Sequence, residues 1–252
     1  MVRAEAATIP LAAMTAAFGL FQRLHLPPPW HPTLTPIPLI VYGAASAVGS
    51  YTIQLAQQAN IHPLICVAGR GIPHVKGLID ESKGDTILDY REGDGKLVQN
   101  LKAAVRRAGG KVEYAFDAVS EHGSYENICK VLDHETGKIT LVLPGKEYQE
   151  IPSTVEKSLT QVGSAHTGTD LDAWQKKTGT MTGNEEFAMA FFRYFGRGLQ
   201  KGFFKGHPHE VVPGGLAGVQ SGLQNLKDGK ASAVKYVFRI GDTEGVAPSA
   251  SN

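Results

Sequence analysis

The sequence predicts an α/β protein with a doubly wound parallel sheet, and two observations point to that class. Short apolar runs alternate along the chain with segments of helical periodicity, which is the pattern of parallel strands joined by crossover helices. Of the 252 residues, 42% are hydrophobic and 19% are charged, so the chain can bury a sizeable core. The formal net charge of +1 gives no indication of a nucleic-acid surface or a polybasic membrane surface.

Residues 1–36 are predicted to form an N-terminal helix followed by a proline-rich connector. The stretch 6–21 is almost free of charge, and its helix is expected to start near Pro10, since proline is tolerated in a first helical turn. Prolines 27–29 end that helix. A secretory signal or membrane anchor is disfavoured because Glu5 lies in the flank that should be basic and the stretch is short for a membrane span. We therefore expect a buried helix in a cytoplasmic protein.

The segment from residue 39 to residue 68 carries the predicted chemistry. Leu39–Tyr42 is an apolar run typical of a buried parallel strand, and a turn of mostly small residues follows it. Apolar residues then recur at helical spacing up to Asn60, a residue type that suits the left-handed position after a helix. Leu64–Ala68 is a second apolar strand. This βαβ unit indicates a Rossmann-type fold, which we predict for residues 37–212.

The turn after the first strand is the predicted phosphate site. A diphosphate can approach the N–H groups at a helix start only where the side chains are small. The turn reads A-x-S-x-x-G instead of G-x-G-x-x-G, so an ordinary α/β turn is the alternative interpretation. The residues expected to bind a cofactor here are Ala44, Ala45, Ser46, Ala47, Val48 and Gly49.

The residues after the second strand, Gly69, Arg70 and Gly71, favour NADP over NAD. Folds that bind NAD usually place an acidic residue at this point for the ribose hydroxyls, and here the first acid is Asp80. A cation instead suits a 2′-phosphate. The alternative is that Arg70 is a solvated loop arginine.

The alternation of strands and helices continues to about residue 143. Strands are predicted at 86–90, 112–119 and 138–143, and helices at 96–108 and 125–132. Parallel strands place ligands at their carboxyl ends, so the rim supplies three more cofactor candidates, Tyr90, Val119 and Leu143.

Beyond this point the pattern loosens. We expect a strand at 159–165, a Thr- and Gly-rich loop at 166–183 and a helix at 185–199. The aromatic stripe of that helix is more typical of a core or a subunit interface than of a cofactor site. Residues 213–241 are predicted as a C-terminal helix and a return strand, and residues 242–252 as a disordered tail.

Three further groups of residues are interpreted structurally. His207 and His209 flank a proline with no third ligand nearby, so a surface loop is expected and a metal site is not. Cys66 and Cys129 lie on apolar faces and are expected to be buried small hydrophobes. Asp117 ends an apolar strand, and we expect it to position the following loop and not to act as a catalytic acid.

The order of these segments resembles the medium-chain dehydrogenase/reductase family, on its zinc-free quinone-reductase and enoyl-reductase side. EAATIPLAAMTAAFGLF resembles the family's first helix, VYGAASAVG its phosphate turn, and FDAVS the strand that reaches the nicotinamide ribose. GGLAGVQSGLQNLKDGKASAVKYVFRI resembles its closing helix and return strand. The similarity covers roughly residues 5–240, and the nearest branch is the fungal trans-enoyl reductases, which are stand-alone partners of polyketide synthases.

The resemblance implies an NADPH-dependent oxidoreductase that reduces an enoyl or quinone substrate by hydride transfer. The implied substrate is a small α,β-unsaturated carbonyl compound or an acyl thioester, with a polyketide synthase as a partner and a homodimer as the assembly. Thr15 matches a threonine that lies near the nicotinamide in the enoyl-reductase branch, which makes it the implied catalytic residue. A buried threonine that bonds its own backbone is the alternative for Thr15.

The chain begins just after the position at which family members have a GroES-like catalytic domain. Only a remnant of that domain is therefore expected beside the Rossmann-type domain. A truncated or inactive nucleotide-binding module without turnover is the alternative function.

Overall fold

A six-stranded parallel sheet forms the centre of the molecule. The computed structural model describes residues 3–166 and 184–246. The strand order is β3-β2-β1-β4-β5-β6, and every neighbouring pair is parallel. The predicted doubly wound sheet is confirmed. Its strands are β1 (Leu39–Tyr42), β2 (Leu64–Ala68), β3 (Thr86–Asp89), β4 (Tyr114–Asp117), β5 (Lys138–Leu141) and β6 (Glu156–Leu159).

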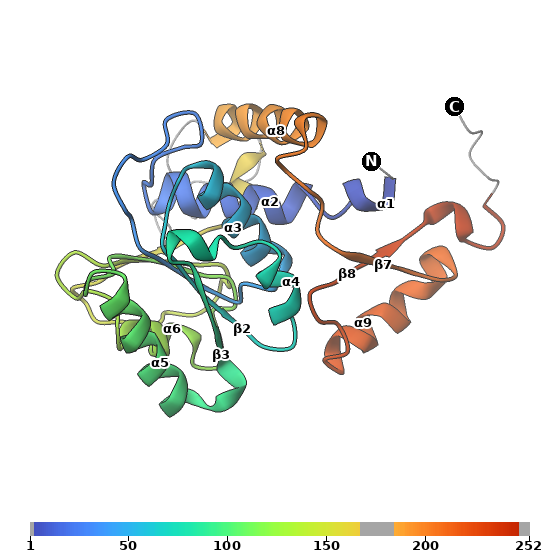
Figure 1. Cartoon of the computed structure of the whole chain (residues 1–252). Coiled ribbons are helices and arrows are strands. Elements are labelled where there is room, and N and C mark those ends of the chain that lie inside the picture. The colour runs from blue at the N-terminus through green and yellow to red at the C-terminus, as the bar shows by residue number, and fades with distance from the viewer. Residues whose placement is uncertain (1–2, 167–183, 247–252) are drawn as a thin grey trace.

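Helices cover both faces of this sheet, and the central strand β1 shows how the sequence achieves this. Leu39 and Val41 belong to one hydrophobic core, whereas Ile40 and Tyr42 belong to the core on the other face. Successive side chains of a strand point to opposite faces, so a strand that is apolar throughout suits a sheet buried on both sides. The first core includes residues of α2 (Pro10–Ala17), α3 (Ala47–Gln58), α4 (Ile72–Lys76) and α8 (Asn184–Lys201), and the second includes residues of α5 (Asp94–Arg107) and α6 (Ser124–Cys129) (Figure 1).

The N-terminal helix is part of the core, as predicted. After α1 (Arg3–Ala6), α2 continues into a π-helical turn, Phe18–Arg23. By length and composition Ala4–Arg23 could cross a membrane, but 72% of its apolar window is buried inside the protein. Met14 and Leu20 are 0% exposed and pack in the same core as α3. The segment therefore packs as a helix of the protein core.

The structure corrects the prediction after β5. The strand expected at 159–165 is wrong, because β6 ends at Leu159 and Val162–Ala165 is a 3-10 turn. β6 lies at the edge of the sheet and begins with the exposed residues Glu156 and Lys157, so no apolar run marks it. α4 (Ile72–Lys76) was not predicted. The loop expected at 166–183 lies, apart from His166, outside the described residues.

The C-terminal part forms a smaller lobe beside the main sheet (Figure 1). β7 (His209–Val212), which no sequence pattern indicates, pairs in parallel with β8 (Lys235–Phe238). A 3-10 turn, Gly215–Gly218, and α9 (Val219–Lys227) join the two strands. The predicted C-terminal helix and return strand are confirmed.

Close packing explains the glycine inside α9. A Cβ at Gly222 would lie 2.6 Å from Cζ of Phe238, so the helix approaches β8 more closely than another residue allows.

The start of the predicted disordered tail is ordered, because the N–H of Leu216 donates to Oγ1 of Thr243 at 2.9 Å. Residues 247–252 of that tail lie outside the described residues.

Candidate nucleotide-binding cleft

A cleft of about 340 Å³ opens at the carboxyl ends of β1 and β2, which is the edge where parallel α/β sheets bind ligands. One wall is the turn after β1, another is the segment after β2, and a third is the small lobe's loop between α9 and β8. The cleft brings most of the predicted cofactor residues together. Its lining is formed by Gly43, Ala45, Ser46, Ala47, Ala68, Gly69, Arg70, Gly71, Tyr90, Val119, His207 and residues 231–234.

The turn after β1 has the backbone geometry of a phosphate site. Oγ of Ser46 accepts a hydrogen bond from the N–H of Gly49 at 3.0 Å and thereby caps α3. The N–H groups of Ala47 and Val48 precede the hydrogen-bond ladder of the helix, so they remain for a ligand. A Cβ at Gly49 would lie 2.3 Å from the carbonyl oxygen of Gly43, so only glycine lets the helix start this close to the strand. This cradle fits a diphosphate.

The segment after β2 is packed equally tightly. A Cβ at Gly69 would lie 2.6 Å from the ring of Tyr90, and one at Gly71 would lie 2.4 Å from Cβ of Ala45. Glycine at both positions therefore lets the segment after β2 lie directly against Tyr90 and against the turn after β1. Tyr90 is 47% exposed, so its ring forms an open aromatic edge of the cleft.

Arg70 is exposed, and it also lines the cleft. Its Nη2 atom donates to the carbonyl oxygens of Gly229 and Ala231, the latter at 3.4 Å. Arg70 therefore ties the small lobe to the main sheet. A guanidinium carries five N–H donors, so donors also remain for an anion in the cleft.

Asp117 holds the loop after β4 in place, as expected. Its carboxylate accepts hydrogen bonds from the N–H groups of Val119 at 3.0 Å and Ser120 at 2.9 Å, and from the hydroxyl of Ser124 at 2.5 Å. Burial raises the pKa of Asp117, and these hydrogen bonds oppose that rise. The loop so fixed presents Val119 to the cleft.

Some predicted cofactor residues do not line the cleft with their side chains. Ala44 is 0% exposed and packs in the core. Val48 and Gly49 contribute to the turn through their backbone at the start of α3. Leu143 lies outside the lining, and its carbonyl oxygen accepts a hydrogen bond from the Tyr148 hydroxyl.

The structure does not bring Thr15 to the cleft. Its side chain is 6% exposed, and its hydroxyl donates to the carbonyl oxygen of Leu11 at 2.8 Å. This is the self-bonded geometry that the sequence leaves open as the alternative. The catalytic role of Thr15 stays a prediction.

The surface loop expected at His207 is wrong. This side chain is only 2% exposed, and the backbone N–H of His207 donates to the Tyr51 hydroxyl at 2.9 Å and to Oγ1 of Thr8 at 3.1 Å. Both partners lie far away in the sequence, so no local pattern could reveal the burial. His209 lies on β7, and among the described residues no group of three or more His, Cys, Asp or Glu is placed to hold a metal ion.

Both cysteines are buried, as predicted. Burial raises the pKa of the Cys66 thiol and raises that of Cys129 to about 11. Thiols in this state are poor nucleophiles, which agrees with a packing role.

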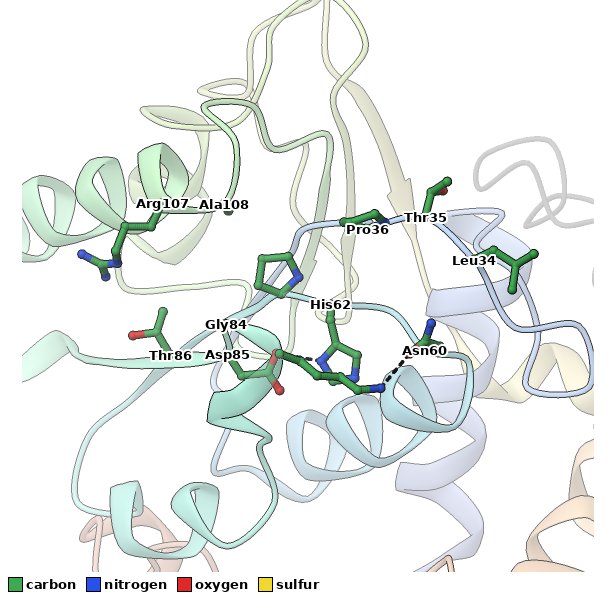
Figure 2. Close-up of a pocket in the computed structure, with 12 residues that line it drawn as sticks. Leu34, Thr35, Pro36, Asn60, His62, Gly84, Asp85, Thr86, Arg107 and Ala108 are labelled. Atoms are coloured by element: carbon green, nitrogen blue, oxygen red, sulfur yellow. Dashed lines mark hydrogen bonds and ion pairs between the residues drawn. The ribbon is translucent and has the colours of Figure 1, made fainter.

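A second and larger cleft of about 610 Å³ lies at the opposite edge of the sheet (Figure 2). Nδ1 of His62 lies 2.8 Å from the Asp85 carboxylate, which also accepts the N–H of Leu64 at 2.7 Å. Nζ of Lys83 donates to Oδ1 of Asn60 at 2.7 Å. These polar groups pair with one another at the amino ends of the strands. Dinucleotides bind at the carboxyl ends, so the larger cleft is not the cofactor candidate.

Known proteins share this fold and much of this sequence. No family model matches the chain. Trans-enoyl reductase fsr4 of Gibberella fujikuroi is 53% identical over 216 residues, which cover 85% of this chain and 59% of the relative. The crystal structure of the CurK enoyl reductase matches with a TM-score of 0.64 at 17% identity, covering 94% of this chain and 64% of that one. CurA of Vibrio vulnificus, solved in complex with NADPH, matches with a TM-score of 0.59 at 17% identity, covering 90% and 61%.

The sheet order and the cleft at the carboxyl ends of β1 and β2 define a Rossmann-type fold, which the chain shares with the CurK enoyl reductase and with CurA. In sequence the chain is similar to a fungal trans-enoyl reductase, which shares more than half of the aligned residues. The chain spans about three fifths of the length of the curated relatives it matches.

Proposed function

We propose that this chain forms the cofactor-binding part of an NADPH-dependent reductase whose substrate is an enoyl compound or a quinone. The cleft between the turn after β1 and the segment after β2 carries the proposal, because its cradle of free N–H groups fits a diphosphate. The 53% identity to a protein named trans-enoyl reductase supports an α,β-unsaturated carbonyl compound or acyl thioester as the substrate. The NADPH complex of CurA, which has the same fold, supports the cofactor.

In this proposal the residues of the chain bind and orient the nucleotide. The N–H groups of Ala47 and Val48 hold the diphosphate, and Arg70 contacts the 2′-phosphate. Asp117 fixes the loop that presents Val119 to the nicotinamide half. When bound, the cofactor supplies the hydride. The catalytic role proposed for Thr15 competes with the self-bonded geometry of its hydroxyl, and turnover of T15V decides between the two.

The remaining features of the proposal follow from the resemblance. We propose a cytoplasmic, zinc-independent protein with a polyketide synthase as a partner and a homodimer as the assembly, and with no nucleic-acid or membrane partner. We also propose that the first helix with its connector, residues 1–36, and the C-terminal helix and return strand, residues 213–241, adjoin the GroES-like domain of longer relatives, and that residues 37–212 are the Rossmann-type domain.

Calorimetric titration with NADPH and NADH tests the cofactor assignment. We expect R70A to weaken NADPH binding about tenfold or more, because it removes a hydrogen bond to a charged group, and to leave NADH binding nearly unchanged. R91A is the matched control, since Arg91 pairs with Asp89 outside the cleft. Absence of NADPH binding at millimolar concentration would overturn the proposal. Turnover of an enoyl thioester tests the substrate class.

A further inference from the structure

The buried His207 imidazole has no role in the proposed cofactor contacts, although it lines the same cleft. Hydrogen bonds from its backbone N–H to Thr8 and Tyr51 fix its position. Its ring meets the ring of His74 edge-on, with 5.1 Å between the ring centroids and an interplanar angle of 89°. The side chain is therefore held rigidly in the wall of the cleft.

The two ring nitrogens of His207 differ in their surroundings. Nδ1 is buried and has no hydrogen-bond partner. Nε2 also has no partner among the described residues, but it is not enclosed by the protein as Nδ1 is. An orphan N–H inside a protein is rarer than an orphan acceptor, so we assign the proton of the neutral ring to Nε2. The neutral ring therefore carries one N–H donor, on the nitrogen that is not enclosed.

The neighbouring imidazole of His74 already has a hydrogen-bond partner. Nε2 of His74 lies 3.1 Å from Oγ of Ser50, whose hydroxyl donates to the carbonyl oxygen of Ala44 at 3.3 Å. His74 therefore directs its N–H to Ser50, behind the phosphate turn. Burial, together with the nearby His74 and Lys235, lowers the pKa of His207 to about 4, so His207 is a neutral donor at pH 7.

We propose that His207 is a phosphate-binding residue, whose Nε2–H donates a hydrogen bond to a phosphate oxygen of the dinucleotide in this cleft. The inference rests on the proposed function and adds a residue to its binding site. A rigid N–H donor beside a phosphate turn suits an anionic oxygen, because hydrogen bonds to charged acceptors are the stronger ones. The oxygen belongs either to the diphosphate or to the 2′-phosphate, which share this chemistry.

Two substitutions separate the hydrogen bond from the shape of the ring. In H207Q the amide nitrogen can replace Nε2 as a donor, whereas H207F keeps a planar ring without a donor. We expect H207F to bind NADPH about tenfold more weakly than the wild type and H207Q to bind within about threefold of it. H209F is the matched control, since His209 lies two positions away and outside the lining. Equal losses for NADPH and NADH identify the diphosphate, and a loss for NADPH alone identifies the 2′-phosphate.

The outcomes separate this inference from the proposed function. If the wild type binds NADPH and H207F binds equally well, the inference is overturned alone. If the wild type binds neither dinucleotide, the proposed function is overturned as well. Nitrogen-15 spectra of the wild-type imidazole give a second readout should H207F fail to fold. The Nε2 resonance of His207 should shift when NADPH is added, and an unchanged resonance overturns the inference.

Discussion

Replacing Gly49 by alanine should push the start of α3 away from the phosphate turn after β1. The new Cβ would lie 2.3 Å from the carbonyl oxygen of Gly43 and 2.8 Å from Cα of Ala44. Both obstacles are backbone, so no side chain can swing away. Reaching an ordinary contact requires a movement of about 1 Å between the turn and α3, and overpacking of this kind costs about 1–3 kcal/mol. We expect G49A to lose that stability and to bind NADPH more weakly, because the cradle moves with the turn.

Urea unfolding followed by circular dichroism measures this loss. G95A is the matched control, since Gly95 lies in the first turn of α5 with nothing within 4 Å of a new Cβ. Alanine there should be neutral or stabilise the protein by up to about 1 kcal/mol through helix propensity. The midpoint of G49A should therefore fall well below those of the wild type and G95A. A G49A midpoint equal to the wild-type value would refute the packing argument.

Two further predictions concern Thr15 and His207. T15V should change NADPH affinity and turnover less than about twofold, because the hydroxyl bonds only to its own helix and a single hydrogen bond to the backbone has a small net effect; a loss of turnover of tenfold or more would instead support the catalytic assignment. The buried His207, with a pKa of about 4, stays neutral in the folded protein while the unfolded chain takes up a proton near pH 6.5, so stability should fall as the pH drops through that interval. Between pH 7 and pH 5 the wild type should lose about 2 kcal/mol more than H207Q in urea unfolding, and equal losses would contradict the lowered pKa.

The central strands were predictable because each is apolar along its whole length. Leu39–Tyr42 and Leu64–Ala68 match the structure residue for residue, since burial on both faces leaves a continuous apolar run. The edge strand Glu156–Leu159 lacks that signal because its solvent-facing residues are charged. Prediction from apolar runs therefore works best at the centre of a sheet.

The cleft was predictable where it is built from consecutive backbone. Small residues at 44–47 and glycines at 49, 69 and 71 stand out in the sequence because each group lies in one short stretch of chain directly after an apolar run. His207 and residues 231–234 reach the cleft through the pairing of β7 with β8, through hydrogen bonds to Thr8 and Tyr51, and through the hydrogen bonds of Arg70 to the small lobe. Contacts between segments so far apart leave no periodic trace in the chain.

The walls of the cleft belong to two bodies, the large sheet and the small lobe, which Arg70 joins across the opening. A rotation of the lobe about the junction near His207 would carry residues 231–234 toward or away from the phosphate turn. The width of the opening therefore depends on where the small lobe lies relative to the sheet. A domain bound to the small lobe would therefore change how easily a nucleotide enters and leaves the cleft, without contacting the nucleotide itself.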